Sequence, residues 1–113
     1  MLLCEGYATA ASVHMATREQ VAACFSSGNM PAASVALRAK YPAKEMIVCA
    51  DADDAGRKAA EATGLKYLRS KFSDVGVDRF RRLSGNPDAR PSDFNDYANV
   101  YSFEDLKKCL MKI

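Results

Sequence analysis

The sequence predicts an α/β fold in which a mainly parallel four-stranded sheet is flanked by helices. Two observations lead to this prediction. Four short apolar runs alternate along the chain with stretches of helical composition, and such alternation implies parallel strands joined by right-handed crossovers. The chain has 113 residues, of which 49% are hydrophobic, and this suffices for one globular domain with one core. We therefore expect a single domain over residues 1–113.

The expected elements alternate, strand then helix, from residue 2 to residue 68. The first helix is rich in alanine, and the second has Pro31 in its first turn, where a missing N–H costs nothing. The third begins after Asp54, a candidate N-cap, and stops at Gly64. A last helix begins at Ser102, with Asp105 three residues on, as in a variant capping box. The predicted strands are Leu2–Cys4, Val21–Phe25, Met46–Ala50 and Leu65–Leu68, and the predicted helices are Tyr7–Ala16, Met30–Lys40, Ala55–Thr63 and Ser102–Met111.

The segment from residue 71 to residue 101 shows no clear hydrophobic period. It contains two prolines and two glycines, which favour turns and loops. We expect it to be irregular, apart from a short helix over Asp78–Leu83.

Acidic side chains follow two of the predicted strands. Glu5 closes the first run, Asp51 and Asp53 close the third, and a further acidic cluster around Asp93 follows the irregular segment. In a parallel α/β sheet, functional residues collect beyond the carboxyl ends of the strands. If strands one and three are neighbours, Glu5, Asp51 and Asp53 converge on one crevice and the strand order is 2-1-3-4.

Several carboxylates in one crevice repel one another unless a counter-charge neutralises them. Their hard oxygen atoms favour Mg²⁺ or Mn²⁺. Two such ions about 4 Å apart can clamp the attacking and leaving oxygens of a phosphoryl displacement. Gly6 and Gly56 would let the backbone come close to the same crevice. The alternative is an ordinary helix N-terminus, where acidic residues interact favourably with the helix dipole.

Four segments together resemble a known family. They are EGYATAAS from residue 5, FSSGN from residue 25, VCADADDAG from residue 48 and PSDFNDYA from residue 91. In order and spacing they are similar to motifs of the Toprim domain, especially in phage- and plasmid-borne primases and primase-helicases. The resemblance covers roughly residues 2–110. It implies the compact, Rossmann-like Toprim fold and the metal-dependent nucleotidyl transfer by which a DNA primase makes RNA primers on single-stranded DNA.

The resemblance also implies roles for individual residues. Glu5 matches a metal ligand or general acid/base, Asp51 and Asp53 match metal ligands, and Asp93 matches a later acidic ligand. Together, Glu5, Asp51 and Asp53 are the expected catalytic residues. Other residues match lesser roles. Gly28 would serve a turn, Asn29 would cap a helix or contact a nucleotide, and Asp54 would be a helix cap or an outer metal ligand. Gly6 and Gly56 would let the backbone approach the crevice closely, and Asp96 would support the metal ligands.

The net charge of the whole chain is only +2, but residues 66–90 carry seven Lys or Arg side chains against three Asp. This basic segment could follow a nucleic-acid backbone, or its arginines could form a solvated surface. The same two interpretations apply to the basic residues that open the third helix. The candidate nucleic-acid or phosphate contacts are Arg57, Lys58, Arg79, Arg81 and Arg82.

The primase interpretation implies Mg²⁺ or Mn²⁺, as two ions. It also implies a single-stranded DNA template, nucleoside triphosphates, and helicase or other primase domains on the same or a partner chain. Because the first strand starts at the first residues, we expect a piece of a longer primase whose isolated domain makes few primers or none. The alternatives are a Toprim nuclease that uses the same carboxylates to activate water, and a non-catalytic Toprim adaptor. A phosphoacceptor signalling domain would instead carry its acidic pair after strand one and a lone Asp after strand three.

Cysteine spacing and hydropathy indicate the compartment. Cys4, Cys24, Cys49 and Cys109 form neither a CxxC pair nor a zinc-type pattern, so we expect buried thiols in a reducing environment. No apolar window approaches the roughly 20 residues of a membrane span, and the N-terminus does not resemble a signal peptide. We expect a cytoplasmic protein that does not enter a membrane.

Overall fold

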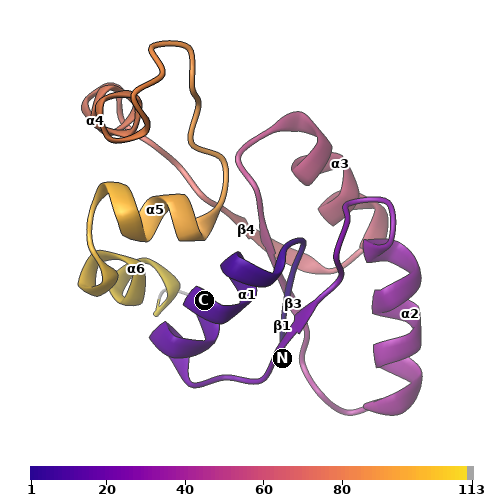
Figure 1. Ribbon diagram of the computed structural model, residues 1–113. Coiled ribbons are helices and arrows are strands. Elements are labelled where there is room, and N and C mark those ends of the chain that lie inside the picture. The colour runs from indigo at the N-terminus through magenta and orange to yellow at the C-terminus, as the bar shows by residue number, and fades with distance from the viewer. Residues whose placement is uncertain (112–113) are drawn as a thin grey trace.

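The computed structural model describes residues 1–111 and has an α/β fold built on one four-stranded sheet (Figure 1). The strand order is β2-β1-β3-β4, and each neighbouring pair is parallel, as the sequence predicts. The last two residues of the expected domain, 112–113, lie outside the described residues. The strands are β1 (Leu2–Cys4), β2 (Val21–Ala23), β3 (Ile47–Ala50) and β4 (Lys66–Arg69), and the helices are α1 (Tyr7–Thr17), α2 (Met30–Lys40), α3 (Asp54–Thr63), α4 (Asp74–Ser84), α5 (Phe94–Val100) and α6 (Phe103–Leu110).

The central strands β1 and β3 are buried on both faces, and their side chains alternate between two hydrophobic clusters. Cys4 and Cys49 belong to the cluster that includes side chains of α1, α5 and α6. Leu3 and Val48 belong to the cluster formed with α2 and α3. Figure 1 shows the same two layers, with α2 and α3 on one side of the sheet and α1, α5 and α6 on the other. The period-two alternation of a strand thus produces a three-layer arrangement.

The segment 71–101 is not irregular, and this prediction was wrong. It contains a full helix, α4, in place of the short helix expected over Asp78–Leu83, and a second helix, α5. Ser73 caps α4 by accepting from the Gly76 N–H at 3.0 Å, and Phe94 on α5 is completely buried. Short helices of this kind depend on caps and tertiary burial more than on periodicity.

Helix α4 stands out from the rest of the fold and packs on α5 (Figure 1). Tyr101, which follows α5, ties its N-terminus down, because the Tyr101 hydroxyl accepts from the Ser73 N–H at 2.9 Å. Gly76 makes this contact possible, since a Cβ at that position would collide with the same hydroxyl oxygen.

Two further findings concern the compartment and the cysteines. Among residues 1–111, no helix combines the length and the apolar character that a bilayer span requires. All four cysteines fall within the described residues and are thiols; Cys4, Cys24 and Cys49 are buried, and Cys109 is partly buried.

Candidate active site

The two acidic strand ends meet, as the strand order requires. Cys4 on β1 is in register with Cys49 on β3, so the residues that follow these strands emerge side by side at the carboxyl edge of the sheet. Glu5 and Asp51 are both half-buried there, and their carboxyl groups share a hydrogen bond. The convergence expected for Glu5 and Asp51 is therefore present.

A hydrogen bond between two carboxyl groups needs a proton, and the pKa of Asp51 is raised accordingly. Burial raises the pKa of Asp51 most, and the hydrogen bond to Glu5 and the nearby charges of Glu5, Asp93 and Asp53 raise it further, to about 8. With this raised pKa, the Glu5–Asp51 pair holds a proton in its shared hydrogen bond at neutral pH. The site thus holds a proton in place of the cation that its carboxylates would otherwise need.

Asp53 caps helix α3, which differs from the expectation that Asp54 would do so. Asp53 Oδ1 accepts from the Gly56 N–H at 2.6 Å, while Asp54 is the first helical residue and is exposed. Gly56 is required at this turn, because a Cβ there would lie 2.9 Å from both the Cβ and the backbone oxygen of Asp51. The close approach expected of Gly56 therefore occurs, and it fixes Asp51 against the first turn of α3.

Asp93 reaches the site from a distant part of the chain as the N-cap of α5. Its Oδ1 accepts from the Asp96 N–H at 2.7 Å, and Asp96 Oδ2 accepts from the N–H groups of Ser92 and Asp93 at 2.9 and 3.4 Å. The Ser92 carbonyl in turn accepts from the Ala52 N–H at 2.5 Å, which joins this turn to the loop after β3. Asp96 thus forms a capping box with Asp93.

The pKa of Asp93 is also raised, chiefly by burial. Thr9, a buried residue of α1, opposes the rise by donating its hydroxyl hydrogen bond to the Asp93 carboxylate. Thr9 was not singled out from the sequence. The sequence offers one signal for such a role, which is that Thr9 lies in the first turn of the helix that follows Glu5 and Gly6.

Arg69, at the end of β4, is a second residue that the sequence analysis missed. Its Nη2 donates to the Ala52 carbonyl at 2.5 Å, so a guanidinium lies beside the loop that carries Asp51 and Asp53. Within the described residues, its buried Nε has no hydrogen-bond partner. The sequence shows Arg69 only as one member of a basic segment, and its position on the last residue of the fourth strand becomes meaningful once the strand order is known.

A profile of the family described as "Toprim domain" matches residues 1–102. The chain belongs to the Toprim family. Among curated proteins it is similar to two Escherichia coli proteins named DNA primase TraC. One is 41% identical over 71 residues, 55% of this chain, and the other 43% identical over 75 residues, 66% of this chain. The chain spans only 5% and 7% of the length of these relatives. No solved structure matches.

The loop after β2 of this Toprim domain carries two of the expected residues. Asn29 occupies the N-cap position of α2, but its side chain makes no capping bond and instead donates to the Cys24 carbonyl at 3.3 Å. Gly28 lies in the turn, yet a Cβ added there would have Ser26 Oγ, at 3.8 Å, as its nearest neighbour. At Gly6 no protein atom of the described residues comes within 4 Å of such a Cβ. Crowding within the described residues therefore does not require glycine at position 28 or at position 6.

The candidate phosphate contacts differ in whether their side chains already form hydrogen bonds or ion pairs within the protein. Arg57 pairs with Glu61 at 3.0 Å and lies 3.9 Å from Asp54. Arg81 donates from Nε to the Ala89 carbonyl at 3.1 Å. The side chains of Lys58, Arg79 and Arg82 are exposed.

The residues of the carboxyl edge fit a divalent cation in their chemistry. Their donors are hard carboxylate oxygens of Glu5, Asp51, Asp53 and Asp93, which suit Mg²⁺ or Mn²⁺. Burial raises the pKa of Asp51 most, and the neighbouring carboxyl groups of Glu5, Asp93 and Asp53 raise it further. In residues 1–111, no three Asp, Glu, His or Cys side chains are gathered closely enough to hold one ion as they stand. An ion would therefore have to displace the Asp51 proton and draw the carboxylates inward.

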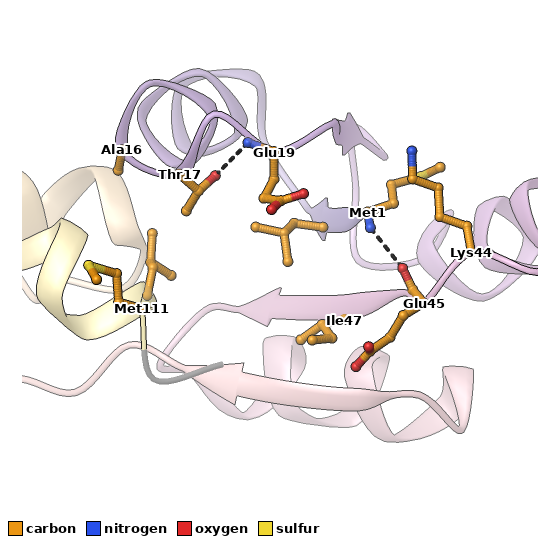
Figure 2. A pocket seen from close by; sticks show the side chains of 10 residues that line it. Met1, Ala16, Thr17, Glu19, Lys44, Glu45, Ile47 and Met111 are labelled. Carbon is orange, nitrogen blue, oxygen red and sulfur yellow. Dashed lines mark hydrogen bonds between the residues drawn. The ribbon is translucent and has the colours of Figure 1, made fainter.

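A cavity at the opposite edge of the sheet is separate from this site (Figure 2). It has a volume of about 640 Å³ and lies at the amino ends of β1 and β3. The α-amino group of Met1 donates to the Glu45 carbonyl at 2.7 Å beside it. Its lining, which includes Leu2, Ala16, Ile47 and Leu110, contains none of the carboxylates of the candidate site.

Proposed function

We propose that this Toprim domain is the metal-dependent nucleotidyl-transfer centre of a DNA primase, which makes RNA primers on a single-stranded DNA template. The observation that carries the proposal is the convergence of Glu5, Asp51 and Asp93 from three distant parts of the chain on the carboxyl edge of the sheet. The similarity to proteins named DNA primase, at 41% and 43% identity, supports a primase over other uses of the same carboxylates.

Each carboxylate has a defined part in this proposal. Glu5, Asp51 and Asp93 would hold Mg²⁺ or Mn²⁺, most simply as two ions, with Asp53 contributing from the α3 cap. When bound, the ions supply positive charge at the oxygens of the transferring phosphoryl group. Asp51 would have to give up its proton for an ion to bind. Asp96 and Thr9 keep Asp93 in position, and Arg69 fixes the loop between Asp51 and Asp53.

The partners follow from the same proposal. They are a single-stranded DNA template, nucleoside triphosphates and further primase or helicase domains, with Lys58, Arg79 and Arg82 as candidate phosphate contacts on the surface. We propose that the chain acts as one domain of a longer primase, because its relatives are many times longer. Four thiols fit a reducing, cytoplasmic location.

Primer synthesis from labelled nucleotides on a single-stranded template tests the proposal. We expect little or no product from the 113-residue chain alone, and product when it is joined to the remaining primase domains. The variant Asp51→Asn should abolish the product, and the matched control Asp78→Asn, at an exposed position of α4, should not. Metal-dependent cleavage of the template in place of synthesis, lost in Glu5→Gln, would mean that the domain is a nuclease.

A further inference from the structure

Phe25 has an unusual backbone conformation at the carboxyl end of β2. Its φ is +70°, in the left-handed region that bulky side chains rarely adopt because the Cβ is crowded there. The ring does not compensate by packing, since the residue is 75% exposed. An aromatic ring is thus held in solvent on a strained backbone. Strained backbone conformations cluster at functional sites.

Tyr7 presents a second exposed aromatic ring at the same edge. It is the first residue of α1, two positions after Glu5, and it is 73% exposed. Its ring therefore contributes little to the core. Both aromatic residues follow strand ends closely, where a parallel α/β sheet places its ligands.

Pairing between β1 and β2 fixes Phe25 relative to the carboxylates. The Cys24 N–H donates to the Cys4 carbonyl at 2.9 Å, so Phe25 emerges next to Glu5. Neighbouring strands are about 4.8 Å apart, and Asp51 follows a strand two places away, so the backbones of Phe25 and Asp51 are separated by roughly 10 Å. The Asn29 side chain holds the end of this loop by its bond to the Cys24 carbonyl.

We propose that Tyr7 and Phe25 form a stacking platform for a nucleobase whose phosphate lies at the carboxylates. The proposal rests on the proposed function, because it takes the ligand to be a nucleotide or a nucleic-acid strand. Exposed aromatic rings stack on any base and so bind single strands without sequence preference. The base could come from a single-stranded template or from a free nucleoside triphosphate, and the two sources share this chemistry.

Tryptophan fluorescence can test the platform, because the chain contains no tryptophan. The variant Phe25→Trp keeps a stacking ring and introduces one reporter. The matched control is Val35→Trp, at a position on α2 that is 70% exposed. At low salt we expect a base-bearing ligand to quench the fluorescence of Phe25→Trp and not that of Val35→Trp. An abasic oligonucleotide of equal length and inorganic triphosphate should quench neither variant.

The ligands in this titration also separate the two sources of the base. Quenching by a short oligodeoxynucleotide assigns the platform to the template, and quenching by ATP assigns it to the incoming nucleotide. Equal quenching in the two tryptophan variants, or quenching by the abasic ligand, would overturn the proposal. So would the absence of quenching by any base-bearing ligand.

A second variant separates a binding role from a structural one. Glycine adopts positive φ without strain, so Phe25→Gly should raise the melting temperature. It should also weaken binding of the ligand that quenches Phe25→Trp by roughly 5- to 150-fold. A ring that only supports the fold, or that contacts another protein, would leave this affinity unchanged and thereby refute the platform.

Neither measurement uses metal or activity. The two proposals can therefore fail separately. If the platform binds bases but the protein neither binds metal nor supports primer synthesis, the proposed function is wrong and the platform stands.

Discussion

Glu5 and Asp51 share a hydrogen bond across the carboxyl ends of β1 and β3, two adjacent parallel strands. Such a bond needs a proton on one of the two carboxyl groups, and the pKa of Asp51 is raised, chiefly by burial. The pair is therefore a site that holds a proton when it holds no cation. Its behaviour with pH and with metal gives the most direct predictions.

Removing the charge of Asp51 should stabilise the metal-free protein at alkaline pH. The pKa of Asp51 is raised from 3.8 to about 8, so the folded state binds the proton more tightly than the unfolded state does. Its contribution to stability is complete below about pH 4 and is lost as the pH rises through 8. Asp51→Asn cannot lose a proton, and at pH 9 it should be more stable than the parent by on the order of 1–3 kcal/mol, allowing for partial solvent screening.

Denaturant unfolding of both proteins between pH 5 and pH 9 measures this difference. The stability of the parent should fall over this range relative to that of Asp51→Asn. A variant that is less stable than the parent at pH 9 would show that Asp51 is not held in its protonated form.

Paramagnetic Mn²⁺ should locate the metal site. In the isotope-labelled chain, Mn²⁺ should first broaden the amide signals near residues 5–6, 51–56 and 93–96, because several carboxylates converge there. Binding should be weak, since the site is open and lacks substrate phosphates. Broadening that begins at the cysteines or at His14 would place the ion elsewhere.

Replacing Gly56 by alanine should damage both the fold and the site. The new Cβ would meet Asp51 Cβ and its backbone oxygen at 2.9 Å, so the turn after β3 must move. We expect a loss of about 1–3 kcal/mol in the free energy of unfolding, together with weaker Mn²⁺ binding. Gly28→Ala is the control, because its nearest neighbour would be 3.8 Å away; equal losses in the two variants would count against this role of Gly56.

The hydroxyl group of Tyr101 should anchor α4. It accepts from the Ser73 N–H at 2.9 Å, and Tyr101→Phe leaves that donor without this partner. Stability should fall by about 0.5–1.5 kcal/mol, and hydrogen exchange should speed up in α4 before other helices. Tyr67→Phe, which removes an exposed hydroxyl bonded to Glu61 at 3.3 Å, should change little. Unaltered exchange in α4 of Tyr101→Phe would contradict the anchor.

The cysteines should be insensitive to reductant. All four are thiols, so reducing agent should leave the melting temperature unchanged. A loss of several kcal/mol, typical of breaking a native disulfide, would contradict both the structure and the reducing compartment.

The sheet and the positions of Glu5 and Asp51 could be predicted because they depend on local sequence signals. The runs ending at Cys4 and Ala50 are fully apolar, and the convergence of the acidic residues directly behind them follows from the strand order. The family resemblance identified Asp93 as a candidate ligand, but it did not predict that Asp93 is the N-cap of α5. The capping box with Asp96 is readable as a pattern, yet the helix it begins is only seven residues long and depends on the burial of Phe94.

Other parts of the site depend on contacts between distant segments, which periodicity does not report. Arg69 lies beside the acidic loop because β4 pairs with β3, and Thr9 contacts Asp93 because α1 packs on α5. The left-handed conformation of Phe25 was also unforeseen, since aromatic residues favour extended strands and the second strand was expected to continue through this position.

Calorimetric titration of Mg²⁺ or Mn²⁺ into the chain near pH 7, in buffers of different ionisation enthalpy, tests the central claim most directly. If the cation replaces the proton shared by Glu5 and Asp51, binding must release protons, and the observed heat must depend on the buffer. Asp51→Asn should lose the binding and the buffer dependence together, while Asp78→Asn should keep both. Binding that releases no proton, or that persists unchanged in Asp51→Asn, would contradict a metal site built on these two carboxyl groups.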